Sequence, residues 1–381
     1  MIEKYQLALL ELIKCSLFGS VPDLPEDTDW DAVFNEAVAQ TVVALAAPAV
    51  PKEHISAWNE PVAKNTAHYM RVLYEQSNLI KLFEANGIPV AVIKGCAAAV
   101  YYPAPERRTM GDIDFLVKDE QFDTAFNLLR VNGYRFEGDF GDDRDHTFVK
   151  GGVVLELHRK YCDKNFDFQN VLSEKMDSLT KRTVCGTVFY SLPDSENGLI
   201  LLDHIRHHLK GGLGIRQIID WMMFVNEVLN SDVFEGIFKE QLSKIGLLTF
   251  CKTVTKMCKK YFGMPADVKW CDDADGSAVD ELFSRVMNSG NFGRKDPYVY
   301  RPMSELTVDI KKYGLFRTLQ KSGVANFPIC RKHKVFRAFA WLFQAFRFAW
   351  RGISALFRGN SLTEDIKKGN ENSDFYKKLG L

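Results

Sequence analysis

The stretch RRTMGDIDFLV, residues 107–117, decides how the middle of the chain folds. Successive side chains of a β-strand point to opposite faces, so Asp112 and Asp114 share one face while Ile113 and Phe115 lie on the other. Two carboxylates about 4 Å apart repel each other by roughly 4 kcal/mol at an effective dielectric constant near 20. The pattern therefore favours a cation bound beside the start of a buried strand.

The segments around this strand alternate between strand and helix patterns. IPVAVIKG, residues 88–95, is a short apolar run rich in Val and Ile, which is typical of a buried strand. We expect a helix in CAAAVYYP at 96–103, another in DEQFDTAFNLLRVNG at 119–133, and a third strand in GGVVLELHRKY at 151–161. Alternating strands and helices predict a small α/β unit with a mixed sheet.

The rest of the chain has the periodicity of helices. Residues 1–87 carry apolar positions at three- and four-residue intervals, and this pattern returns between about 195 and 290. The predicted fold class is α+β, with a small mixed-sheet domain embedded in a largely helical chain. We expect four parts: a helical region at 1–87, the α/β domain at 88–194, a helical substrate-side domain at 195–330 that becomes irregular after 290, and a basic aromatic helix with a mobile polar tail at 331–381.

Composition excludes a strong overall attraction to nucleic acid or membrane. Lys and Arg number 49, as do Asp and Glu, so any such attraction has to be local. The eight cysteines are scattered without metal-ligand spacing, which indicates reduced thiols. The first residues lack the basic start and apolar core of a signal peptide, and no run of 18 apolar residues occurs. We expect a cytoplasmic protein.

A third acid follows on the next predicted strand. In VVLELH, residues 153–158, Glu156 shares a face with Val154 and His158. If this strand lies beside DIDFLV, Glu156 sits next to the two aspartates. Carboxylate ligands favour Mg²⁺, or Mn²⁺, over zinc. Two such ions, about 3.5–4 Å apart, form the general clamp for phosphoryl and nucleotidyl transfer.

With these acids, VIKGCAAAVYYPAPERRTMGDIDFLV followed by VVLELHRKY resembles the polymerase-β-type nucleotidyltransferase superfamily. It is most similar to the uncharacterised bacterial group called nucleotidyltransferase family proteins, over roughly residues 85–225. The resemblance makes 88–194 the expected nucleotidyltransferase domain. Carried over by motif, the small-residue loop corresponds to Lys94-Gly95, and the catalytic metal-binding acids correspond to Asp112, Asp114 and Glu156.

The loop departs from the superfamily pattern, because Cys96 follows Gly95 where a serine usually contacts phosphate. The third acid is also a Glu rather than an Asp. The resemblance implies that Lys94, Arg107 or Arg108 replaces the missing phosphate contact. Gly95 would let the backbone approach a triphosphate closely, at N–H groups that suit an anion. A plain turn at Gly95 and a merely exposed arginine remain the structural alternatives.

A helical segment, DHIRHHLKGGLGIRQIIDW at 203–221, resembles the region that follows the catalytic unit in the same group. His204 and His208 lie one turn apart on one face. A HExxH zinc site needs Glu after the first His, and this chain has Ile there. We expect the substrate-side residues either to line the cleft or to form a buried polar network, and His158 either to orient a ligand or to make a structural hydrogen bond. The substrate-side residues are His158, His204, His208, Arg216 and Asp220.

Residues 331–358 carry seven Lys or Arg and no acid. At 100° per residue, four of these arginines and one glutamine fall on one narrow stripe of an otherwise apolar, aromatic helix. The helix could pack on the other domains, lie on anionic lipid as a peripheral membrane contact, or face a nucleic acid. The stripe is formed by Arg337, Gln344, Arg347, Arg351 and Arg358.

The sequence therefore predicts a Mg²⁺-dependent (or Mn²⁺-dependent) nucleotidyltransferase. It would bind an NTP such as ATP, move the NMP to a hydroxyl of an unknown acceptor, and release pyrophosphate. Glu156 or Asp114 is the candidate base. A small molecule such as an aminoglycoside-like sugar is favoured over an RNA end, and a protein hydroxyl is also open. The alternative is a catalytically decayed nucleotidyltransferase-fold protein that acts as a nucleotide-binding or partner-binding module.

Overall fold

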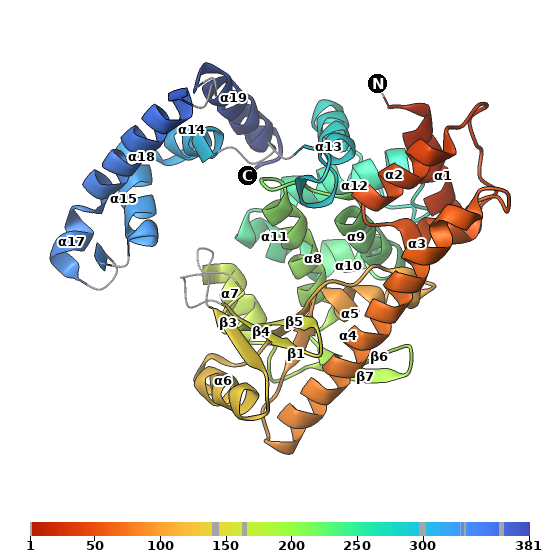
Figure 1. The fold of residues 1–381 in the computed structure, drawn as a ribbon, viewed down its shortest axis with the longest axis horizontal. Coiled ribbons are helices and arrows are strands. Elements are labelled where there is room, and N and C mark those ends of the chain that lie inside the picture. The colour runs from red at the N-terminus through yellow and green to blue at the C-terminus, as the bar shows by residue number, and fades with distance from the viewer. Residues whose placement is uncertain are drawn as a thin grey trace. The chain divides into compact units, whose positions relative to one another are not determined.

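The computed structural model describes residues 2–138, 145–161, 166–296, 302–327, 329–330, 333–357 and 362–381. The chain forms two compact units, one ending at Asp296 and the other following it (Figure 1). Each unit is described by itself. No helix in the described ranges combines the length and the apolar character needed to cross a bilayer.

The first unit is built around a five-stranded mixed sheet with the order β1-β2-β5-β4-β3. Strands β2 and β5 run parallel, and every other neighbouring pair is antiparallel. The mixed sheet and the α+β class predicted from the sequence are therefore confirmed. The strands are β1 (Ala91–Ile93), β2 (Ile113–Leu116), β3 (Arg135–Gly138), β4 (Asp145–Lys150) and β5 (Val153–His158), and a separate hairpin is formed by β6 (Thr180–Val184) and β7 (Thr187–Ser191).

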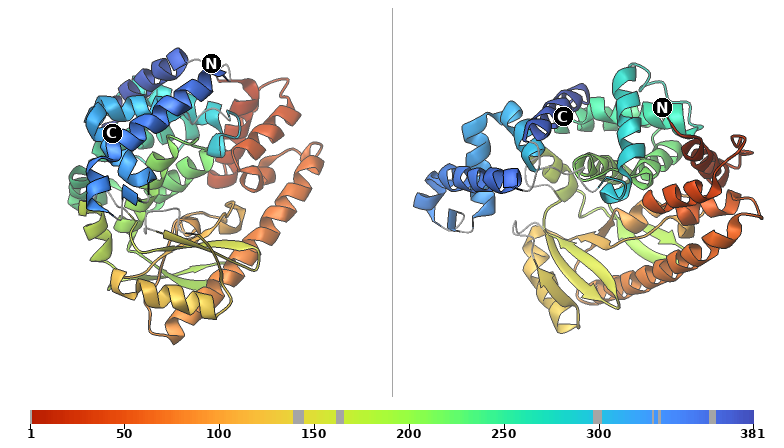
Figure 2. Two further views of the ribbon diagram at one scale, coloured as in Figure 1. Left: turned by 60° about the vertical axis from the view of Figure 1, so that its left-hand side comes forward. Right: turned by 45° about the horizontal axis from the view of Figure 1, so that its top comes forward.

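Helices precede the sheet, connect its strands and follow it. The longest, α4, runs beside the sheet (Figures 1 and 2). The helices of the first unit are α1 (Lys4–Phe18), α2 (Trp30–Ala39), α3 (Val43–Ala46), α4 (Asn59–Ala85), α5 (Gly95–Ala99), α6 (Phe122–Val131), α7 (Phe166–Ser173), α8 (Asp194–His208), α9 (Ile215–Glu227), α10 (Ser231–Val233), α11 (Lys239–Ile245), α12 (Leu248–Phe262) and α13 (Gly276–Ser289), followed by the short η6 (Asn291–Gly293).

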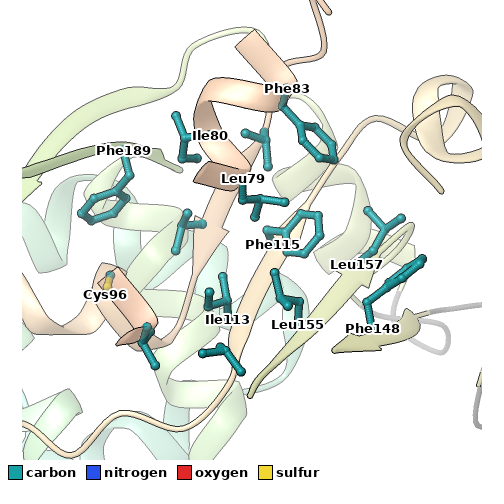
Figure 3. Packing of buried hydrophobic residues seen from close by; sticks show 14 of the residues in the cluster. Leu79, Ile80, Phe83, Cys96, Ile113, Phe115, Phe148, Leu155, Leu157 and Phe189 are labelled. Carbon is teal, nitrogen blue, oxygen red and sulfur yellow. The ribbon is translucent and has the colours of Figure 1, made fainter. Parts of the chain in front are cut away.

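The apolar face of the sheet packs against α4. Phe115 of β2 and Leu155 of β5 are fully buried, and the Phe83 ring of α4 meets the Phe115 ring edge-on at 5.7 Å between centroids (Figure 3). Burying each such side chain stabilises the fold by about 1.5–3 kcal/mol. Because strand side chains alternate, this core fixes which way Asp114 and Glu156 point.

The second unit is helical, and two expectations for it were wrong. The stretch after residue 290 is not irregular throughout, and the tail forms a helix. Gly369 lies so close to α14 that a Cβ there would approach the Thr307 Cβ to 2.6 Å, and Phe375 and Leu379 are buried. The tail is helical because these side chains gain a packing partner. The helices are α14 (Pro302–Tyr313), α15 (Leu315–Asn326), α17 (Lys334–Ala338), α18 (Ala340–Phe357) and α19 (Leu362–Lys378).

The aromatic helix predicted at about 334–358 corresponds to α17 and α18. Helix α18 crosses α15 closely, because a Cβ on Gly323 would lie 2.1 Å from the carbonyl oxygen of Ala340. Ala340 and Gln344 are buried at this crossing, whereas Phe346 and Trp350 are exposed. Of the predicted stripe, Arg358 and the side chain of Arg351 lie outside the described residues.

Candidate active site

The turn between β1 and α5 holds a lysine in a strained conformation. Lys94 has φ 54° and ψ −133°, a combination that non-glycine residues rarely adopt. Such strain costs about 1–3 kcal/mol and persists only where the surroundings enforce it. Here the Lys94 Nζ donates to Asp114 Oδ1 at 2.6 Å. The following residue, Gly95, has φ 20°, and a Cβ there would have only Asp112 O (3.6 Å) and Met110 Cε (3.8 Å) within 4 Å.

Parallel pairing of β2 with β5 brings acids from two strands together. Asp114 lies directly opposite Glu156 in the register. The Nε2 of His158 lies 3.0 Å from Asp114 Oδ1 and 3.5 Å from Glu156 Oε2. One ligand atom from each of these three side chains lies within 4.8 Å of the other two. Two carboxylates and an imidazole therefore converge at one point beside Lys94.

Asp112 precedes β2 and completes the acidic cluster. The negative charge of Asp114, followed by burial, raises the pKa of Asp112 to about 6. Burial opposes ionisation of Asp114, but Lys94 and His158 outweigh it and lower the Asp114 pKa. Burial likewise opposes the charged form of Lys94, and the carboxylates Asp114 and Asp112 outweigh it and raise the Lys94 pKa. One lysine thus stabilises Asp114 but leaves Asp112 under repulsion.

A pocket of about 280 Å³ opens over this cluster. Its size is near the lower end for small-molecule sites, which is roughly 300 Å³. One wall comes from the sheet and the β1–α5 turn, and the other from α8, α9 and η6. The lining residues are Lys94, Gly95, Arg108, Gly111, Asp112, Asp114, Glu156, His158, Tyr161, His204, His207, His208, Arg216 and Phe292.

Of the predicted phosphate-binding arginines, Arg108 is engaged elsewhere. Its Nε and Nη2 each donate to a carboxylate oxygen of Asp220 at 2.7 Å, and the hydroxyl of Tyr102 also donates to Asp220 at 2.7 Å. The Arg108 and Asp220 side chains are only 3% and 2% exposed. Arg107 is half-exposed near Glu106 and does not line the pocket. Asp220 therefore lies in a buried polar network, one of the two arrangements expected for the substrate-side residues, whereas Arg108 is not the exposed arginine that was its structural alternative.

The two predicted histidines of α8 face each other. Their Nε2 atoms lie 2.9 Å apart, so one ring donates to the other. Burial, followed by the positive charge of Lys94, lowers the pKa of His204. Burial, followed by Arg216, lowers the pKa of His208 to about 4. Both rings are therefore neutral at pH 7. Arg216 donates to the carbonyl of Thr109 at 3.1 Å.

Sequence reasoning missed four lining residues: Gly111, Tyr161, His207 and Phe292. Tyr161 follows β5, and its ring centroid lies 5.8 Å from the Lys94 Nζ. His207 neighbours the predicted His208 and could have been found from the same helix. Phe292 lies in a stretch that was expected to be irregular, and no sequence pattern connects it with the strands.

The comparison with protein families agrees with this geometry. The sequence model of a family described as an uncharacterised nucleotidyltransferase matches residues 26–263, more than half of the chain. The matched residues include β1, β2, β5, α8 and α9 but not Phe292. No curated protein matches the chain.

Proposed function

Because the chain belongs to the uncharacterised nucleotidyltransferase family, we propose that it is a Mg²⁺-dependent nucleotidyltransferase. It moves an NMP from an NTP to a hydroxyl of a second substrate and releases pyrophosphate. The observation that carries this proposal is the register of β2 and β5, in which Asp114 lies opposite Glu156 within a pocket that also contains Lys94.

The donor set of the pocket fits a divalent cation. The ligand atoms of Asp114, Glu156 and His158 converge within 4.8 Å, and Asp112 adds a carboxylate whose raised pKa reports uncompensated negative charge. We propose Asp112, Asp114 and Glu156 as the ligands of Mg²⁺ or Mn²⁺, with His158 holding Asp114 in place. When bound, the cation supplies charge neutralisation at the phosphates and activates the attacking oxygen.

Lys94 and Gly95 form the proposed phosphate-binding turn. The Lys94 ammonium pairs with Asp114 and lines the same pocket, where it could contact a phosphate oxygen as a point charge. Gly95 lines the same pocket, and without a side chain it lets the backbone of the turn approach a phosphate there. Arg108 is not part of the proposed phosphate site, because it would have to leave Asp220 to reach a phosphate and would thereby break a buried ion pair.

Glu156 is the better placed general base of the two candidates. Its side chain is 23% exposed, whereas that of Asp114 is 3% exposed and is paired with both Lys94 and His158. A base has to reach the proton that it removes. Glu156 therefore accepts the proton of the acceptor hydroxyl as the oxygen attacks the α-phosphate in line. Most of the rate acceleration would come from positioning and charge neutralisation.

The acceptor would enter along the helical wall of the pocket. This wall offers the neutral rings of His204 and His208 and the guanidinium of Arg216. These groups can hydrogen-bond hydroxyls or contact an anionic group. The limited volume favours a small hydroxylated molecule over a nucleic-acid end.

Incubation with NTPs labelled at the α-phosphate, Mg²⁺ and a panel of hydroxyl acceptors tests the proposal. We expect label transfer and pyrophosphate release that Asp114→Ala and Glu156→Gln abolish. Glu137→Gln on β3, an exposed acid of the same sheet, is the matched control and should leave both unchanged. The enzymatic proposal fails if wild type neither binds NTP nor releases pyrophosphate, and if Asp114→Ala does not alter nucleotide affinity.

A nucleotide-binding module without catalysis is the second candidate. Cys96 stands where the superfamily usually has a serine, and Lys94 is paired with a metal-ligand candidate. This reading predicts nucleotide binding that needs Asp114 but never yields labelled product with any acceptor class. The same assay therefore separates the two candidates.

For the second unit we propose contact with anionic lipid through α17 and α18. Residues 310–363 contain eleven Lys or Arg and no acid. Several large apolar side chains on these helices are exposed, which is unusual for a helix packed only within a protein. Cationic and aromatic side chains together suit the headgroup region of an anionic bilayer. The exposed apolar residues are Val335, Phe336, Phe339, Leu342, Phe343, Phe346 and Trp350.

Sedimentation with lipid vesicles tests this contact on the full chain. We expect binding to phosphatidylcholine vesicles that contain phosphatidylglycerol, and loss of binding in Phe346→Ser/Trp350→Ser. The control Met70→Ser/Tyr74→Ser, which removes exposed apolar side chains of α4, should still bind. Absence of sedimentation with anionic vesicles, or equal sedimentation of both variants, would contradict the proposal.

A further inference from the structure

Phe292 presents an exposed aromatic ring at the edge of the pocket. It lies in η6, and its side chain is 60% exposed although it lines the pocket with the acidic cluster. Its backbone has φ 55° and ψ 33°, the left-handed region that is rare for bulky residues. The backbone of Phe292 is strained and its large apolar side chain is exposed, so the residue does not stabilise the fold where it lies. Such an outlier points to a role in binding.

The segment that carries this ring is anchored firmly. The backbone N–H of Phe292 donates to the carbonyl of Gly212 at 3.0 Å, and the buried Gln217 side chain donates to Asn291 Oδ1 at 2.8 Å. Gly212, between α8 and α9, has φ 104°, and a Cβ there would lie 2.0 Å from the backbone nitrogen of Gly293. The two loops are thus packed backbone against backbone. The position of the ring is therefore set by the fold.

The Phe292 ring contacts one neighbouring ring and is otherwise largely exposed. The rings of His208 and Phe292 meet at 72° with centroids 4.9 Å apart, which is an edge contact. His208 is neutral at pH 7, since burial lowers its pKa to about 4. An edge contact of this kind steadies the Phe292 ring without covering both of its faces.

We propose that Phe292 is the stacking platform for the nucleobase of the NTP. This inference rests on the proposed function and adds the base to it. The proposed phosphate-binding groups, Lys94 and Gly95, and the metal-ligand candidates come from the sheet and the β1–α5 turn, whereas Phe292 comes from η6 in the other wall of the same pocket, so a nucleotide with its phosphates at Lys94 would place its base toward the ring. Every nucleobase has a planar π-face, and stacking on an aromatic side chain tolerates all of them. The platform therefore gives affinity for nucleotides without strict selection of one base.

Calorimetric titration with two ligands isolates the base from the phosphates. The ligands are the α,β-methylene analogue of ATP, whose α–β bond is not cleaved, and inorganic tripolyphosphate, both with Mg²⁺. Phe292→Asn removes the ring with a residue that tolerates the left-handed backbone. We expect it to weaken the analogue roughly 5- to 150-fold, the range of base–aromatic stacking, and to leave tripolyphosphate unchanged. Phe292→Trp should restore the affinity, and Tyr74→Ala, which removes an exposed aromatic ring of α4, should have no effect.

The outcomes separate the two proposals. If wild type binds both ligands and Phe292→Asn changes neither affinity, the platform is refuted while the nucleotide site stands. If Phe292→Asn weakens both ligands equally, the residue supports the loop and not the base, which also refutes the platform. If wild type binds neither ligand, the proposed function is refuted, and the platform is refuted with it. Should Phe292→Asn not fold, quenching of the Phe292→Trp fluorescence by the analogue but not by tripolyphosphate decides the question.

Discussion

Replacing Asp220 by Asn should strongly destabilise the first unit. Asp220 accepts two hydrogen bonds from Arg108 at 2.7 Å, and both side chains are almost fully buried. Hydrogen bonds to charged groups contribute about 1.5–3 kcal/mol each. Asn keeps one acceptor oxygen but removes the charge, so the Arg108 guanidinium stays buried without a counter-ion. We expect the free energy of unfolding to fall by about 3–5 kcal/mol, a large part of a typical total of 5–15 kcal/mol.

Urea denaturation followed by circular dichroism measures this change, with Asp280→Asn as the control. Asp280 pairs with Lys260 at the surface, where such pairs contribute about 0–1 kcal/mol. Replacing both partners, as in Arg108→Met/Asp220→Leu, should cost less than Asp220→Asn alone, because the buried charge of Arg108 is removed together with its partner. The reasoning is refuted if Asp220→Asn shifts the midpoint no more than Asp280→Asn does.

Two further predictions concern the acidic cluster and the loop that carries Phe292. The folded-state pKa of Asp112, about 6, lies above the ordinary value near 3.9, so its ionisation destabilises the metal-free protein as pH rises between these values. In EDTA, Asp112→Asn should therefore raise the free energy of unfolding by up to about 3 kcal/mol at pH 8 and by little at pH 4. Thermal melts at both pH values measure this difference. Gly212→Ala should lower the melting temperature, because Gly212 has φ 104° and a Cβ there would collide with the backbone of Gly293. Gly211→Ala should not lower it, because a Cβ there has nothing within 4 Å. Equal melting temperatures of the two alanine variants would contradict the tight packing of these loops.

The sequence predicted the part of the site that depends on alternation along strands. Asp114 and Glu156 were placed on one face by their spacing and on neighbouring strands by their context, and the β2–β5 register agrees. The sequence also contains the signal of a β-hairpin. Gly151 and Gly152, both with positive φ, form the two-residue turn between β4 and β5, so β4 could have been expected.

Contacts between distant segments could not be predicted in this way. Arg108 and Asp220 are far apart in sequence, and periodicity says only that each is polar. Phe292 reaches the pocket through backbone packing against Gly212, for which no pattern exists. The division of the chain into four parts stays a prediction, and so do the catalytic and binding roles of the individual residues.

Manganese titration tests the central claim most directly, because it asks whether acids from two strands bind one cation. Mn²⁺ binding to wild type can be followed by electron paramagnetic resonance, with no need to know the acceptor. We expect wild type and Glu137→Gln to bind Mn²⁺ with the same affinity, and both Asp114→Asn and Glu156→Gln to weaken binding at least tenfold. Unchanged Mn²⁺ affinity in either of these two variants would contradict a cation site shared by β2 and β5.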